Sequence, residues 1–133
     1  MIYMLDTNIC IYLIKERSRQ LVSQLRRFHT GELGVSAIVV GELYYGVSKS
    51  TQKDRNRAAL AAFLLPFEIA PLSDEVMPVY GQLRTELEVS GNPIGSLDML
   101  IAAHALALDV PLVTNNTHEF ARVKGLRLED WSA

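Results

Sequence analysis

The chain has 133 residues, of which 49% are hydrophobic and 21% charged, and its formal net charge is −2. This length fits one domain, expected to span residues 1–133, and the composition excludes a disordered chain because it can supply a core. The slightly acidic balance excludes binding to nucleic acid by net charge alone. Any such binding would depend on local Lys and Arg side chains.

Cysteine usage and hydrophobic patterning indicate the compartment. Cys10 is the only cysteine, so no disulfide can form within the chain, as expected in a reducing environment. The apolar start of the chain contains Asp6 and lacks the basic beginning and cleavage site of a signal peptide. No apolar stretch approaches the roughly 20 residues that span a bilayer. We therefore expect a cytoplasmic protein without membrane contact.

The first half of the chain has the pattern of short apolar strands separated by helices. Ser, Thr and Asn precede several helical stretches, where they can cap a helix by accepting a hydrogen bond from a first-turn amide. In chain order we expect a strand at Ile2–Leu5, a helix at Ile9–Lys15 capped by Thr7 or Asn8, a helix from Ser18 to Thr30, a strand at Leu33–Val35, a helix at Ala37–Val47 capped by Ser36, a helix that ends at Leu65, and a strand at Phe67–Ala70.

The second half continues the alternation. We expect a helix capped by Ser73 that bends at Pro78 and ends at Ser90, a helix capped by Ser96 that ends near Leu108, a strand at Pro111–Thr114, a loop or short helical turn at Asn115–Phe120, and a strand at Leu126–Glu129. Strands that alternate with helices predict an α/β fold with a parallel sheet.

Three acidic residues stand at the borders of apolar segments: Asp6, Glu42 and Asp98. Burial of an unpaired charge is costly, so each position needs an explanation. Sites in open parallel sheets lie at the carboxyl ends of strands, and we therefore expect the three carboxylates to converge on one cleft. Clusters of carboxylate oxygens favour Mg²⁺ or Mn²⁺. Taken singly, however, each acid has a structural explanation, since Asp residues favour helix N-termini and a helical Glu is ordinarily solvated.

Short motifs that cover essentially the whole chain accompany these acids. They are Met4-Leu5-Asp6-Thr7-Asn8, Gly41-Glu42-Leu43 followed by Tyr45-Gly46, Pro93-Ile94-Gly95 leading to Asp98 and Ile101-Ala102, Val113-Thr114-Asn115-Asn116 with Glu119-Phe120, and the tail from Gly125 to Trp131. In this order and spacing, the motifs resemble the PIN-domain ribonucleases, specifically the VapC-type toxins of bacterial toxin–antitoxin pairs.

The resemblance implies both a fold and a reaction. The fold is PIN-like, a short central parallel sheet flanked by helices. The reaction is endonucleolytic cleavage of RNA that depends on Mg²⁺ (or Mn²⁺), in which water activated by the metal attacks a phosphodiester in line and leaves a 5′-phosphate and a 3′-hydroxyl. By the same resemblance, Asp6, Glu42 and Asp98 form the acidic centre, and Asp6 and Asp98 are the metal ligands.

The last motif departs from the family pattern. Many members carry an Asp where this chain has Asn115 and Asn116. Glu119 is the only nearby carboxylate and is assigned the fourth acidic role, while Asn116 holds either a water or a neighbouring carboxylate. Thr7 and Thr114 are expected to orient the carboxylates or a metal-bound water.

The resemblance also implies partners. A VapB-type antitoxin would wrap the toxin and direct a basic side chain or segment toward the acidic cleft. The substrate would be structured RNA, most often tRNA in close relatives, and its cleavage would inhibit translation. The toxin itself is expected to form a homodimer.

Two alternative functions stay open. A phosphotransferase with Asp6 as nucleophile commonly carries a second Asp two positions later, where this chain has Asn8, and it would leave Glu42 unexplained. A non-catalytic RNA-binding PIN module would gain nothing from a cleft of mutually repelling acids.

The remaining polar and aromatic residues are given structural roles. His29, His104 and His118 lack the spacing of metal ligands, which disfavours zinc, and His104 is expected to pack between helices. The basic groups at residues 15–19 and 49–57 are expected to be solvated faces, with phosphate contact as the functional alternative. Aromatic side chains, Tyr44 and Tyr45 among them, are expected to be core or dimer contacts rather than base-stacking platforms. Trp131 is expected to pin the C-terminal segment to the body.

Overall fold

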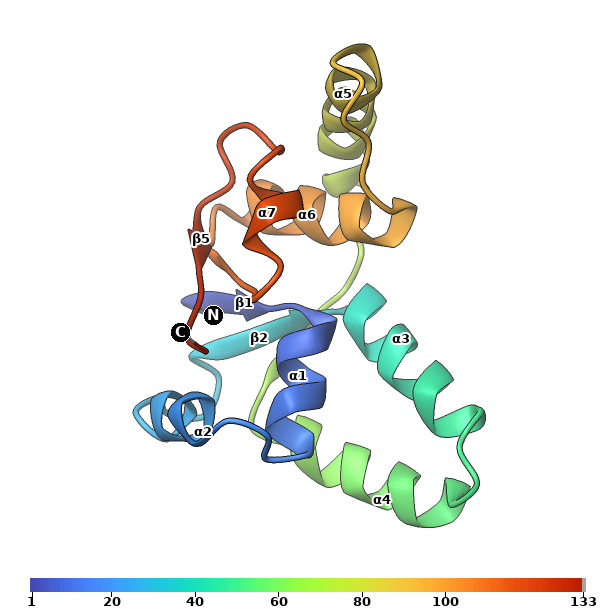
Figure 1. Ribbon diagram of the computed structural model, residues 1–133, viewed down its shortest axis with the longest axis vertical. Helices are drawn as coiled ribbons and strands as arrows, with labels where there is room; N and C mark the ends of the chain where they lie inside the picture. Colours follow the sequence, from blue (N-terminus) through green and yellow to red (C-terminus); the bar gives the residue numbers. More distant parts are fainter. Residues whose placement is uncertain (133) are drawn as a thin grey trace.

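A five-stranded parallel sheet forms the centre of the molecule (Figure 1). The computed structural model describes residues 1–132, so Ala133, the last residue of the expected domain, lies outside them. The strands are β1 (Tyr3–Leu5), β2 (Leu33–Ser36), β3 (Glu68–Ala70), β4 (Leu112–Val113) and β5 (Leu128–Glu129). Their order in the sheet is β3-β2-β1-β4-β5. The predicted parallel α/β architecture is therefore confirmed.

The first strand of the chain occupies the middle of this sheet. Met4 of β1 is aligned with Gly34 on one side and with Leu112 on the other, and Leu5 is aligned with Val113. These β1 and β4 side chains are fully buried, as expected for strands covered on both faces. The register brings the carboxyl ends of β1 and β4 to the same edge of the sheet.

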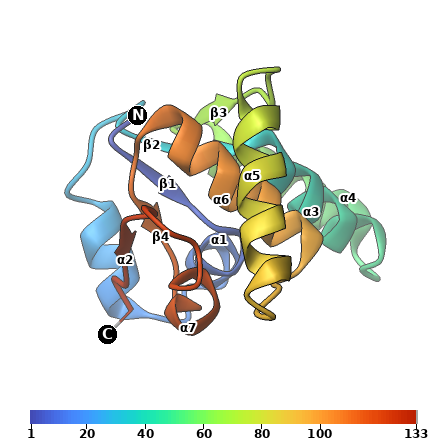
Figure 2. The same ribbon diagram turned by 90° about the horizontal axis from the view of Figure 1, so that it is seen from above.

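Helices cover both faces of the sheet and extend beyond it. In the part of the chain that the structure describes they are α1 (Thr7–Ile14), α2 (Arg19–Leu25), α3 (Ala37–Ser48), α4 (Lys53–Leu64), α5 (Val76–Val89), α6 (Ser96–Leu108) and α7 (Thr117–Phe120). Helices α3 and α4 pack against each other as a hairpin that projects from the sheet, and α5 crosses α6 (Figures 1 and 2). Within residues 1–132, no helix has the length and apolar character needed to cross a membrane.

Helix caps agree with the prediction at two positions in the first half of the chain. The Ser18 hydroxyl accepts a hydrogen bond from the amide of Leu21, and the Ser36 hydroxyl accepts one from the amide of Ile38. The predicted cap of α1 is wrong, however. Asp6 occupies the cap position with extended backbone and accepts from the amide of Ile9 at 2.9 Å, whereas Thr7 is already helical. Both residue types cap well, so the local sequence did not decide between them.

Predicted helix bounds needed correction at three places. The helix after Ser18 ends at Leu25 rather than Thr30 because the following amides turn back onto residues 24 and 25. Ser96 is the first residue of α6 and Gly95 holds its cap position, while α5 begins three residues after Ser73. Pro78 lies in the first turn of α5, where amides have no partner within the helix, so it imposes no bend there.

The C-terminal segment is attached to the sheet by aromatic contacts. The Trp131 ring stacks on Phe28 at 5.3 Å between centroids and meets Tyr3 of β1 edge to face at 5.2 Å. Its indole N–H donates to Glu129 Oε1 at 2.9 Å. The predicted pinning role of Trp131 is confirmed.

Candidate active site

Asp6 is the most buried of the candidate acids, with 4% of its surface exposed. It follows the last residue of β1 at the carboxyl edge of the sheet. Both oxygens of its carboxylate accept hydrogen bonds, Oδ1 from the amide of Ile9 at 2.9 Å and Oδ2 from the hydroxyl of Thr114 at 2.5 Å. Asp6 thus joins the end of β1 to the start of α1 and to the end of β4.

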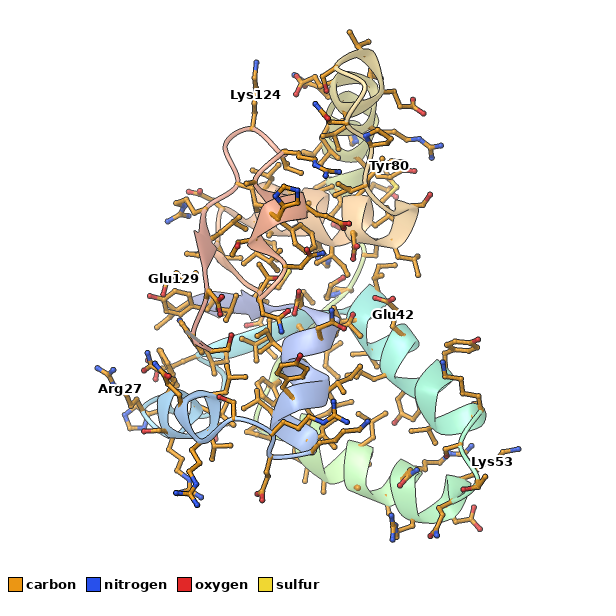
Figure 3. The ribbon with its side chains drawn as sticks, viewed as in Figure 1. Arg27, Glu42, Lys53, Tyr80, Lys124 and Glu129 are labelled. Carbon is orange, nitrogen blue, oxygen red and sulfur yellow. The ribbon has the colours of Figure 1, made fainter. Side chains whose placement is uncertain are left out.

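Glu42 reaches the same region from α3. Figure 3 shows it on the early turns of that helix, at the level where α1 begins. The Thr7 hydroxyl donates to Glu42 Oε1 at 2.6 Å. Because Asp6 rather than Thr7 caps α1, the Thr7 side chain is free to make this contact, and it ties the first residue of α1 to α3.

Asp98 and Glu119 complete the acidic group. Asp98 is half-buried in the first turn of α6, as predicted. Glu119 lies on α7, where the side-chain amide of Asn116 donates to its Oε2 at 3.0 Å. The backbone N–H of Asn116 donates in turn to the Thr114 hydroxyl at 2.9 Å. A continuous chain of hydrogen bonds therefore runs from Asp6 through Thr114 and Asn116 to Glu119.

The electrostatics of the group link its members through Asp98: Asp98 and Glu42 act on Asp6, and Glu42 and Glu119 act on Asp98. Burial raises the pKa of Asp6 to about 6, against the lowering effect of the bonds from Thr114 and Ile9, and the charges of Asp98 and Glu42 raise it further. Burial also raises the pKa of Asp98, followed by the charges of Glu42 and Glu119. The structure thus brings together all four acids that the sequence singled out.

Such an arrangement suits a hard divalent cation. Within residues 1–132, no three Asp, Glu, His or Cys side chains are already grouped closely enough to hold a metal ion as they stand. The donors are nevertheless carboxylate oxygens, which Mg²⁺ and Mn²⁺ prefer, and Mg²⁺ commonly keeps several waters and binds through one or two carboxylates. A bound cation would also offset the burial and, to a smaller extent, the repulsion between carboxylates that raise the pKa values of Asp6 and Asp98. The residues present therefore fit a divalent metal.

His104 has no part in this group, as expected. It is 1% exposed on α6, and its Nδ1 lies 2.8 Å from the hydroxyl of Ser36 at the start of α3. Burial lowers the pKa of the ring, which favours the neutral form. The predicted helix-packing role is confirmed.

The sequence did not predict which hydroxyl or amide side chain forms a hydrogen bond with which carboxylate. It gave Thr7 and Thr114 an orienting role without saying which carboxylate each one holds. In the structure, the Thr7 hydroxyl donates a hydrogen bond to Glu42, and the Thr114 hydroxyl donates one to Asp6. For the Asn116 side chain, whose expected partner was a water or a neighbouring carboxylate, the structure shows a hydrogen bond to Glu119. The only available signal was the Thr-Asn-Asn run that directly follows an apolar strand.

Comparison with known proteins identifies the family. The PIN domain model matches residues 3–126. The chain therefore belongs to the PIN-domain family. A ribonuclease VapC2 from Rickettsia felis is 47% identical over 132 residues that cover 98% of each chain. A tRNA(fMet)-specific endonuclease VapC from Shigella flexneri is 40% identical over 130 residues, again with 98% of each chain covered.

Solved structures agree with this assignment. VapBC2 from Rickettsia felis, bound to a DNA fragment from its promoter, matches with a TM-score of 0.91 and 46% identity over 98% of this chain and 99% of that chain. DNA-bound VapBC from Salmonella typhimurium matches with a TM-score of 0.92 and 37% identity over 97% of both chains. These relatives confirm the predicted PIN-like fold and the resemblance to VapC proteins.

Proposed function

We propose that this protein is an endoribonuclease toxin of a toxin–antitoxin pair, which hydrolyses RNA phosphodiester bonds with the help of Mg²⁺ or Mn²⁺. The observation that carries the proposal is the convergence of Asp6, Glu42, Asp98 and Glu119 at the carboxyl edge of the sheet, where their charges act on one another. Relatives named ribonucleases, up to 47% identical over nearly the whole chain, support the same reaction.

Asp6 and Asp98 would hold the cation, with Glu42 and Glu119 as the completing acids. A divalent cation supplies two things in such a site: it activates a water molecule at neutral pH, and it neutralises charge that develops on the phosphate. The protein's part is to keep the carboxylates ionised and oriented. Bonds from Thr114 and the Ile9 amide favour the charged form of Asp6, whose burial opposes it.

The other two acids are held by their own donors. Thr7 fixes one oxygen of Glu42 and Asn116 fixes one oxygen of Glu119. In each case the second carboxylate oxygen is left for a ligand or a water. Since ligand-orienting partners typically change metal affinity or activity by about 10- to 100-fold, Thr7, Thr114 and Asn116 are assigned this supporting role.

For the substrate we propose tRNA. Relatives from Shigella flexneri and Salmonella typhimurium, 40% and 37% identical, carry the name tRNA(fMet)-specific endonuclease, which makes initiator tRNA the first substrate to try. For the partner we propose a VapB-type antitoxin, as in the VapBC complexes that share this fold. A basic segment of the antitoxin would be attracted to the acidic centre and exclude cation and substrate. The homodimer implied by the family resemblance belongs to the same proposal.

The test is cleavage of total RNA and purified tRNA by the isolated protein, with Mg²⁺ or Mn²⁺ and with EDTA. We expect metal-dependent cuts that leave 5′-phosphate ends, and no cuts by an Asp98→Asn variant. Addition of the cognate antitoxin should suppress the cuts. RNA binding without cleavage at any metal concentration would favour the non-catalytic RNA-binding module. Hydrolysis of a simple phosphate monoester, with RNA left intact, would favour the phosphotransferase.

A further inference from the structure

We propose that one face of α3 holds a nucleotide of the RNA beside the acidic residues, with the Tyr45 ring stacked on its base. The inference rests on the proposed ribonuclease function and adds the place where the substrate is gripped. We call this surface the α3 face and define it by Glu42, Tyr45, Gly46 and Lys49.

These four residues share one side of the helix because of their spacing. Residues three, four and seven positions after Glu42 return to the same side, since an α-helix has about 3.6 residues per turn. Tyr45 follows Glu42 at a rise of only about 4.5 Å along the axis. A base on the Tyr45 ring would therefore lie within about one nucleotide of a phosphate at the acidic centre.

Tyr45 is the most exposed aromatic side chain of this helix, with 66% of its surface accessible. The Lys49 ammonium lies over one face of its ring at 4.7 Å from the centroid. Since Lys49 lies over one face and the residue is still 66% exposed, we infer that the other face of the ring is open to solvent. It is therefore not a core contact, which was one of the two roles expected for it beside a dimer contact. An open aromatic face next to a cation is the usual platform for a nucleotide, where the ring meets the base and the cation meets the phosphate.

Gly46 leaves the helix backbone uncovered on this side, as Gly41 of the same helix does at its own position. A Cβ built at this position would meet no atom within 4 Å beyond the helix's own backbone, so packing within the described chain does not require a glycine. Glycine inside a helix is destabilising by roughly 0.5–1 kcal/mol relative to alanine. A glycine beside Tyr45 on the open side of α3 instead lets another molecule approach the helix backbone closely.

Charge favours RNA as that molecule. Beyond Lys49, the chain enters α4 with Lys53, Arg55 and Arg57, all exposed. Figure 3 shows Glu42 on α3 and Lys53 at the far end of the α3–α4 hairpin, so the helix runs from the one toward the other. Cations along this line would contact the phosphates that flank the cleaved bond, in a protein whose net charge alone would repel RNA.

The chain offers a matched control for Tyr45. Tyr80 on α5 also carries a cation four residues later, because Arg84 Cζ lies 5.9 Å from its ring centroid and Arg84 donates to its hydroxyl at 2.6 Å. Figure 3 shows Tyr80 on α5, away from Glu42 and Lys53. A Tyr–cation pair alone therefore does not define the site; its position beside Glu42 does.

The first measurement is binding of tRNA to inactive Asp98→Asn protein, together with KM and kcat of tRNA cleavage in the otherwise native protein. Stacking on one aromatic ring corresponds to about 5- to 150-fold in affinity. We expect Tyr45→Ala to weaken binding and raise KM within this range, with no loss in the temperature of unfolding. Tyr45→Phe should restore the affinity, and Tyr80→Ala should leave it unchanged. Gly46→Ala should raise the unfolding temperature and weaken binding.

The second measurement locates the base. Single bases are removed in turn from a tRNA at the positions around the cut. Removal of the base that stacks on Tyr45 should weaken binding to native protein as much as the Tyr45→Ala substitution does. The same removal should not weaken binding to the Tyr45→Ala variant any further. Losses that add at every position overturn the stacking. If the Tyr45→Ala variant binds RNA with unchanged affinity, the inference is overturned but the proposed ribonuclease function is not. This holds whether or not the variant loses self-association or antitoxin binding. Absence of RNA cleavage by the native protein overturns the proposed function as well.

Discussion

The hydroxyl of Thr114 donates a hydrogen bond to Asp6 Oδ2 across 108 residues of sequence and joins the ends of two neighbouring strands. The same hydroxyl oxygen accepts the backbone N–H of Asn116. Thr114 is completely buried, so both bonds are shielded from water. One side chain therefore controls the charge state of Asp6 and the position of the segment that carries Glu119.

Replacement of Thr114 by valine should impair the site while keeping the side-chain shape. Loss of the hydroxyl removes a bond that lowers the pKa of Asp6, so the carboxylate will hold its proton more tightly. The Asn116 amide also loses its acceptor, at a cost of about 1–3 kcal/mol in the free energy of unfolding. We expect Thr114→Val to require more Mg²⁺ for half-maximal cleavage, most strongly near pH 6. Thr114→Ser keeps the hydroxyl and serves as the control; equal Mg²⁺ requirements for Val and Ser would refute this account.

The raised pKa of Asp6 also predicts how stability depends on pH in metal-free protein. Folded Asp6 binds its proton with a pKa of about 6, against 3.8 as the ordinary value. The protonated group therefore stabilises the fold fully below about pH 4, and this contribution is lost as the pH rises through about 6. Between pH 4 and 7, native protein should lose on the order of 3 kcal/mol of unfolding free energy relative to Asp6→Asn.

Urea unfolding in EDTA across this pH range measures that difference. Asparagine retains an oxygen for the Ile9 amide, so the α1 cap survives in the variant. Parallel curves for the two proteins would show that Asp6 titrates normally. Mg²⁺ should stabilise the native protein at pH 7 more than the variant, because the cation binds the folded carboxylates.

Asp98→Asn separates activity from folding. The substitution removes a charge that is repelled by Glu42 and Glu119 and whose burial is unfavourable. We expect RNA cleavage to be abolished, while the metal-free variant unfolds at the same or a higher temperature than the native protein. Calorimetry in EDTA and a cleavage assay of the same preparation give both readouts. Cleavage at the native rate would remove Asp98 from the site.

The fourth acid is tested by the pair Glu119 and Asn116. Since the Asn116 amide donates to Glu119, the two residues should behave as a unit. We expect Glu119→Gln to lose cleavage, Asn116→Ala to lose about 10- to 100-fold, and the double variant to be no worse than Glu119→Gln alone. Normal cleavage by Glu119→Gln together with inactive Asn116→Ala would assign the role to the asparagine instead.

Local sequence rules predicted most of the fold. The alternation of short apolar runs with helical stretches located the five strands of the sheet. Hydroxyl residues before helices identified the caps at Ser18 and Ser36. The same rule failed at Ser73 and Ser96, because a hydroxyl also needs the right backbone position relative to the first helical turn. At Asp6 and Thr7, two good capping residues are adjacent. Asp6 caps the helix, and Thr7 instead donates to Glu42, which is 35 residues away in sequence.

The acidic residues could be found from sequence because a carboxylate at the border of an apolar segment is a local signal. Their hydrogen-bond partners could not be assigned, since these depend on which strands become neighbours. Tyr45 is the clearest example of such a limit: it stands in a run of apolar residues and has the pattern of a core aromatic. Only its 66% exposure separates it from Leu43 and Val47, which are buried.

The order of strands in the sheet has a consequence during synthesis on the ribosome. Strand β1 is made first, yet it lies between β2 and β4, and β4 begins at residue 112. A nascent chain can form the β1–β2 side early but lacks Thr114 and Glu119 until β4 and α7 emerge. Domains fold as units when their pairing segments are complete. An enzyme that attacks the cell's own RNA would thus acquire its full set of acids only after β4 and α7 have been made, well after β1 and β2, which gives a partner made beforehand the time to meet it.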